Sequence, residues 1–190
     1  GVFRGGMDEQ RRGHLDIGNF YLFGGGHPTL IDSGSFNYGT PIYDTYLSQS
    51  IAHNLVLVDN KPQVRADGQL LAAVGTSRLT AASGQLAAAY PNALKSWTRD
   101  LLLLPGGLAI VLDRLEGKGP HRFDYVLHPY WPFKLPLPNA APGELLVGEG
   151  DKPTRLDLYS EASFTVSQQD GYFQGTPRKY VRFDSVEPAE

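Results

Sequence analysis

Apolar and polar residues alternate with a period of two along most of this chain, which is the pattern of half-buried β-strands. The clearest case is residues 97–117, where two alternating runs flank the breaker Pro105-Gly106-Gly107 and predict a hairpin. A second hairpin is expected over residues 19–34, around a Gly-Gly-Gly-His-Pro break. Single strands are expected within residues 52–63, 121–131, 154–160, 163–169 and 179–186.

Two segments are less clear. Residues 78–91 are rich in alanine, which favours a helix, but Gly84 and the short repeat favour two strands around a turn, and we expect the strands. Residues 134–150 are rich in proline and glycine and are expected to form a long loop. No long segment has a period of 3.6 residues. We therefore predict one all-β domain over residues 1–190, an antiparallel two-sheet β-sandwich.

Composition narrows the function classes. The chain has 190 residues, 41% of them hydrophobic, which is enough for a sizeable core. A net charge of −3 gives no overall basic field for nucleic acid, although a local basic cluster could still hold an anionic polymer. No apolar run reaches the roughly 20 residues that span a bilayer, so we expect no membrane partner. Without cysteine there are no thiolate metal ligands.

The chain begins with glycine and shows no signal peptide, which indicates a processed product or a piece of a longer protein.

Candidate chemistry centres on His14 and Asp16 in the stretch "RRGHLDIGNF", which otherwise has the pattern of a strand. Such a pair could be a hydrogen bond on a sheet face, half of a catalytic site or one arm of a metal site. Asp32 lies 18 residues further on and His53 lies 39 further on. Even separations across a hairpin place residues on one face, so the three side chains can converge. Two imidazoles and a carboxylate are a common ligand set for Zn²⁺, but spacing alone does not establish such a site.

The segments "GHLDIGNFYLFGGGHPTLIDSG" and "YLSQSIAHNLVLVDNKPQ" resemble the signature of the heparinase II/III-like family of polysaccharide lyases. The family pattern is His-x-His-x-Asp, an apolar strand, Asp-x-Gly, and a His-Asn that opens a valine-rich strand. The resemblance extends over roughly residues 10–133, with weaker similarity in its later part. The matching positions are His14, Asp16, Asp32, Gly34, His53, Asn54, Asp59 and Gln63.

This resemblance implies a zinc ion, or another divalent metal, held by His14, Asp32 and His53, with Asp16 orienting a ligand or a nearby backbone group. It also implies β-elimination on an anionic uronic-acid polysaccharide, of the heparan sulfate or alginate type, in the periplasm or outside the cell. The family places an N-terminal α/α-barrel domain before this β domain, and nothing in the 190 residues resembles that barrel. The expected substrate contacts are Arg12, Tyr38, Tyr43, Tyr46 and Asn54.

The sequence departs from the family at Arg12, where the family has the first histidine of His-x-His. Arginine cannot act as a general base at neutral pH, because its pKa exceeds about 12, but it can bind a carboxylate or sulfate. Catalytic residues are therefore not assigned. The alternative function is a non-catalytic carbohydrate-binding or structural β domain whose metal ties strands together.

Overall fold

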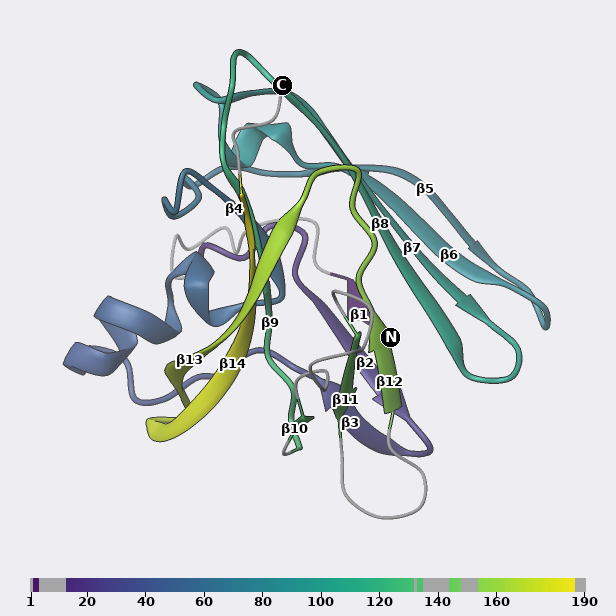
Figure 1. Cartoon of the computed structure of the whole chain (residues 1–190), viewed down its shortest axis with the longest axis horizontal. Helices are drawn as coiled ribbons and strands as arrows, with labels where there is room; N and C mark the ends of the chain where they lie inside the picture. Colours follow the sequence, from purple (N-terminus) through teal and green to yellow (C-terminus); the bar gives the residue numbers. More distant parts are fainter. Residues whose placement is uncertain (1, 4–12, 132, 135–143, 148–153, 187–190) are drawn as a thin grey trace.

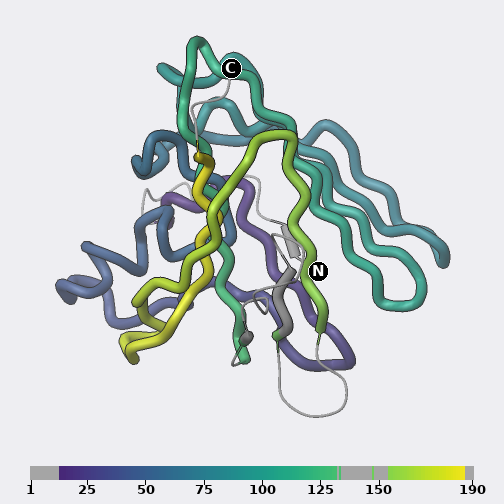
Figure 2. The backbone as a smooth tube through the Cα atoms, in the orientation of Figure 1, coloured from purple at the N-terminus to yellow at the C-terminus, as the bar shows by residue number. Residues whose placement is uncertain are grey.

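The structure is a computed structural model that describes residues 2–3, 13–131, 133–134, 144–147 and 154–186 (Figures 1 and 2). It is almost entirely β. The strands are β1 Val2–Phe3, β2 Phe20–Gly24, β3 His27–Leu30, β4 Leu55–Val58, β5 Gln69–Gly75, β6 Thr80–Gln85, β7 Leu94–Leu104, β8 Leu108–Gly117, β9 Phe123–Leu127, β10 Phe133–Lys134, β11 Glu144–Val147, β12 Thr154–Asp157, β13 Phe164–Phe173 and β14 Thr176–Ser185.

Three short helical segments interrupt the strands. A π-helical turn, η1, spans Tyr43–Leu47, and two 3-10 turns, η2 and η3, span Ser50–Ala52 and Ala87–Ala89. None of the helices in the described residues is both long and apolar enough to cross a membrane.

The strands form four hydrogen-bonded groups, and every pairing between the described strands is antiparallel. Two groups have four strands, in the orders β13-β14-β9-β4 and β5-β6-β7-β8, and two have three, β1-β2-β3 and β10-β11-β12. The sheets pack face to face as a sandwich (Figure 1). The predicted fold class is confirmed.

The core between the layers draws apolar side chains from strands distant in sequence. One cluster joins β2, β3, β7, β9, β11 and β14 through Phe20, Leu30, Leu101, Leu127, Val147, Val181 and Phe183. A second cluster packs β4 against the start of β7, and Trp97 is its largest side chain. All four residues of β4 are buried, which explains why this strand is apolar on both faces instead of alternating.

Both predicted hairpins are present. Strands β7 and β8 pair from Leu104↔Leu108 outward, and Gly106 and Gly107 both have φ of 84° in the turn. Strands β2 and β3 pair around a turn at Gly25-Gly26. The other expected strands correspond to β4, β9, β12, β13 and β14.

Three expectations about loops and strands are wrong. Residues 78–91 hold one strand, β6, followed by η3, because the Gln85 side chain accepts hydrogen bonds from the backbone N–H groups of Ala87 and Trp97 and so closes a turn. Within residues 134–150, β11 pairs with β10 and β12. The rest of that expected loop lies outside the described residues.

Residues 13–19, expected to be a strand, have no regular structure before β2 begins at Phe20. Gly18 turns the chain at φ of 86°, a conformation that favours glycine. The buried Gln63 side chain then occupies the hydrogen-bonding groups of Ile17: its Oε1 accepts from the backbone N–H at 2.8 Å, and its Nε2 donates to the carbonyl at 2.9 Å. A side chain thus takes the place of a neighbouring strand.

Candidate metal centre

The structure brings His14, Asp32 and His53 together, with one ligand atom from each lying within 4.8 Å of the others. None of the three lies in a strand. His14 precedes β2, Asp32 follows β3 by two residues, and His53 lies between η2 and β4. The predicted convergence is therefore present, but loop ends produce it, and cross-strand register does not.

Asp32 is held by a ring of donors. Its Oδ2 accepts hydrogen bonds from Tyr21 Oη at 2.6 Å and Asn19 Nδ2 at 3.1 Å, and its Oδ1 accepts from the backbone N–H of Gly34 at 2.9 Å. Burial opposes ionisation of Asp32, but the hydrogen bond and charge of His53, together with these donors, lower its pKa below the usual range. The carboxylate is therefore ionised and fixed in orientation, as a metal ligand must be.

His53 is fully buried, and its Nδ1 lies 3.0 Å from Asp32 Oδ2. Its Nε2 has no hydrogen-bond partner within the described part of the chain, which is rare for a buried imidazole nitrogen. The His14 ring lies beside it, with centroids 5.1 Å apart. Two imidazoles, one ionised carboxylate and one unsatisfied buried nitrogen fit a divalent cation such as Zn²⁺.

An aromatic path leads from the surface to this group. The Tyr38 ring is 70% exposed and lies 4.8 Å from the Tyr43 ring, which lies 5.5 Å from the His14 ring. Tyr38 and Tyr43, two of the expected substrate contacts, therefore lie beside the candidate metal ligands.

Tyr46 lies on the other side of η1, where its ring meets Tyr172 at 5.3 Å. Burial raises the pKa of Tyr46 to about 12, so its hydroxyl keeps its proton at neutral pH.

Asn54 takes a framing position. It is fully buried, its Nδ2 donates to the Phe20 carbonyl at 2.8 Å, and its Oδ1 accepts from the backbone N–H of His128 at 2.8 Å. Its own N–H donates to Asn19 Oδ1 at 3.0 Å. Both ends of the side-chain amide therefore bond to backbone groups beside the metal group, at β2 and after β9. The role of Asn54 as a substrate contact stays a prediction.

Two other predicted residues are less informative. Arg12 lies outside the described residues. Asp16, two residues after His14, is buried. Its role in orienting a ligand stays a prediction.

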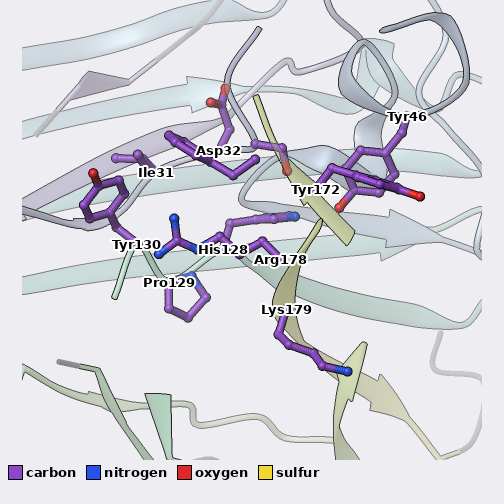
Figure 3. Close-up of a pocket in the computed structure, with 11 residues that line it drawn as sticks. Ile31, Asp32, Tyr46, His128, Pro129, Tyr130, Tyr172, Arg178 and Lys179 are labelled. Carbon is purple, nitrogen blue, oxygen red and sulfur yellow. The ribbon is translucent and has the colours of Figure 1, made fainter. Parts of the chain in front are cut away.

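A pocket next to Asp32 contains residues that sequence analysis missed (Figure 3). It lies where the ends of β3 and β9 meet the β13–β14 hairpin. Besides Asp32 and Tyr46 its lining includes Ser33, His128, Tyr130, Tyr172, Phe173 and Arg178. The only sequence signal was the group of aromatic and basic residues in "GYFQGTPRKY", on either side of a turn.

His128, which follows β9, is buried and stacks on Tyr180 with ring centroids 5.2 Å apart. Burial, with the nearby His53, lowers the pKa of His128 to about 3, so its ring is neutral.

The family model described as "Heparinase II/III-like, C-terminal" matches residues 5–171. The chain belongs to this family. The match includes His14, Asp32, His53 and residues 38–46, which contain the three tyrosines. It ends within β13, so the second strand of the β13–β14 hairpin lies beyond it.

Solved structures of heparinases have the same fold. A heparinase III gene product with methylated lysines is 15% identical, with a TM-score of 0.80 over 100% of this chain and 29% of that chain. A mutant of the heparan sulfate lyase HepC from Pedobacter heparinus is 17% identical, with a TM-score of 0.76 over 93% of this chain and 28% of that one. This chain thus spans less than a third of the length of these heparinases. No curated protein matches.

Proposed function

We propose that residues 1–190 are the metal-holding C-terminal β domain of a polysaccharide lyase that cleaves uronic-acid polysaccharides, of the heparan sulfate or alginate type, by β-elimination. The proposal includes an N-terminal α/α-barrel domain in the same protein and a location in the periplasm or outside the cell. The observation that carries it is the convergence of His14, Asp32 and His53 in a heparinase II/III-like domain.

β-Elimination removes the proton at C5 of the uronate and breaks the C4–O bond, so it needs a base, an acid and a positive environment for the carboxylate. A divalent cation bound at His14, Asp32 and His53 supplies positive charge and ties three loop ends together. The exposed ring of Tyr38 offers a face on which a sugar packs, and Tyr43 supports it. Protonated Tyr46 is suited to donating a hydrogen bond and unsuited to acting as a base at neutral pH.

Metal binding is tested first. Elemental analysis of the unchelated chain should find close to one equivalent of zinc or another divalent metal. His53→Ala should lose it, while His27→Ala, which changes an exposed histidine in β3, should keep it. Equal metal content in His53→Ala and the parent would exclude this ligand set.

Lyase action is tested by the ultraviolet absorbance of unsaturated products from heparan sulfate, alginate and hyaluronan. The longer protein that contains this chain should produce them. The 190-residue chain alone should not, because the family's helical half is missing from it. Steady product formation by the chain alone would contradict this division of labour.

The alternative, a non-catalytic carbohydrate-binding or structural domain, rests on Arg12, which stands where the family has a histidine. It predicts metal and polysaccharide binding in the longer protein without unsaturated products.

A further inference from the structure

Arg178 has no acidic partner among the residues that the structure describes. It follows the turn between β13 and β14, and its guanidinium lies 5.0 Å from the centre of the Tyr130 ring and 5.3 Å from that of Phe173. No carboxylate among the described residues forms an ion pair with it, whereas the neighbouring Lys179 pairs with Asp170. The two rings fix the plane of the guanidinium and leave its N–H donors to be satisfied from elsewhere.

The pocket beside Arg178 contains further unsatisfied polar atoms. Ser33 Oγ, Tyr46 Oη and both ring nitrogens of His128 are buried and form no hydrogen bond of good geometry in the described part of the chain, although Ser33 and Tyr172 lie close to the Tyr46 hydroxyl and the Ile51 backbone lies close to the His128 ring. Poorly paired buried polar groups are costly, so a polar group of a ligand or an ordered water would complete their hydrogen bonds. Figure 3 shows Arg178 beside His128 and Tyr130, with Lys179 pointing away from them.

A close backbone approach shapes this pocket. Gly171 on β13 is the cross-strand partner of Arg178, and a Cβ atom there would lie 2.2 Å from Tyr46 Oη. Glycine therefore lets Tyr46 reach the hairpin. The enclosed space is small, about 10 Å³, which is room for about one water molecule or one ligand oxygen, and the hollow opens to solvent. Asp32 belongs to both the pocket lining and the metal group, so a polymer chain passing the metal group can reach Arg178.

We propose that Arg178, held between Tyr130 and Phe173, binds an anionic group of the polysaccharide, a carboxylate or a sulfate, at a subsite beside the metal centre. This inference rests on the proposed function for the identity of the polymer. A guanidinium binds either anion through two parallel hydrogen bonds, and the neutral ring of His128 and the protonated Tyr46 lie in the same pocket for neighbouring polar groups of the ligand or for ordered water.

The test is calorimetric titration of the full 190-residue chain at fixed ionic strength with two probes of equal length, a heparan sulfate oligosaccharide and a non-sulfated hyaluronan oligosaccharide. Arg178→Ala should weaken binding by about tenfold or more, the loss of a charge-assisted pair. Arg178→Lys keeps the charge without the planar fork and should also bind more weakly. Arg114→Ala is the matched control, because it removes the same charge at an exposed arginine outside the pocket. Arg114 lies on β8 and pairs with Asp100 on β7.

The two probes distinguish the source of the anion. Equal weakening for both assigns the site to the uronate carboxylate, and weakening for heparan sulfate alone assigns it to sulfate. If Arg178→Ala and Arg178→Lys, both folded by circular dichroism, bind both probes as tightly as the parent, the subsite is wrong although the proposed function stands.

A second measurement separates the subsite from the function. Inorganic sulfate should shift the Arg178 side-chain Nε–Hε signal in an NMR titration, with the signal assigned by its loss in Arg178→Lys. If the parent chain binds neither oligosaccharide but sulfate shifts this signal, the polysaccharide function fails and the anion site remains. If sulfate leaves the signal unmoved and the oligosaccharides do not bind, both proposals are overturned.

Discussion

Two buried charged clusters involve residues 13–20, one through Gly18 and one through His14. They differ in how completely the protein satisfies the hydrogen bonds of their polar atoms. In the first, Arg99 is fully buried and forms a bidentate pair with Asp113, at 2.7 and 2.8 Å. Its Nη1 donates to the carbonyls of Gly18 and Asn54, and Trp97 Nε1 donates to the same Asp113 carboxylate. The rings of Phe20, Trp97 and Tyr125 surround the guanidinium.

The second cluster, at His14, Asp32 and His53, leaves buried polar atoms unpaired. His53 Nε2 has no partner in the described residues, and in the adjoining pocket Ser33, Tyr46 and His128 form no hydrogen bond of good geometry with the described residues. A buried charge stabilises a fold only when its hydrogen bonds are complete. The Arg99 cluster meets that condition with protein groups alone, which marks it as structural, whereas the metal centre needs a cation and a ligand to meet it.

The comparison predicts its largest effect at Arg99. Arg99→Met should lower the free energy of unfolding by about 3–5 kcal/mol, because it leaves the Asp113 carboxylate buried without its partner. Urea denaturation measures this change. The control is Arg114→Met, an exposed arginine on β8, which should stay within about 0.5 kcal/mol of the parent. A small effect at Arg99 would show that this cluster is no more structural than a surface pair.

Metal removal should affect only the second cluster. With metal present at about a thousand times its dissociation constant, binding to the native state adds about 4 kcal/mol, which a chelator removes. His53→Ala should make stability insensitive to the chelator. Arg99→Met should keep its full destabilisation with and without metal. Thermal unfolding with and without EDTA tests both statements, and a parent melting temperature that EDTA leaves unchanged would contradict the first.

Sequence patterns predicted the strands best where two local signals agreed. Around Pro105-Gly106-Gly107 the alternation and the turn residues both indicate a hairpin, and the hairpin forms as expected. The expected strand at residues 13–19 is absent, and the Gln63 side chain, more than forty residues away, takes the backbone hydrogen bonds of Ile17 in its place. Gln85 closes its turn in the same way. Long-range side-chain bonds of this kind leave no local periodicity.

For the site, resemblance to the family supplied His14, Asp32 and His53, because their spacing alone allows many other choices. It could not supply Arg178, whose place in the pocket depends on the pairing of β13 with β14 and on ring contacts with Tyr130 and Phe173. The framing bonds of Asn54 could not be predicted for a related reason, since both ends of its amide bond to backbone groups that only the folded chain brings near.

Arg12 tests whether substrate completes the second cluster. Although this residue lies outside the described residues, it is two positions from His14. If it faces the cleft, a guanidinium beside a dication requires an anion between them or screening by solvent. Arg12→Ala in the longer protein should then weaken binding of uronate oligosaccharides by about 1–3 kcal/mol. Calorimetry at fixed ionic strength is the measurement, and unchanged affinity would make Arg12 a surface residue that pairs with Asp8 or Glu9.

The last prediction is a pH dependence of stability from His128. Its pKa is about 3 in the fold, mainly through burial, and about 6.5 in an unfolded chain. Between these values the unfolded state binds a proton that the folded state does not, so stability must fall as the pH falls from about 6.5 towards 3. The slope should be about 1 kcal/mol per pH unit. His128→Phe keeps a ring stacked on Tyr180 and should reduce the pH slope. Urea denaturation in EDTA between about pH 4.5 and 7 measures this slope. The lowered pKa of Asp32 also contributes stability, but that contribution is lost only as the pH falls below the ordinary carboxylate range, outside this window. Equal slopes in His128→Phe and the parent would show that the unpaired imidazole does not control acid stability.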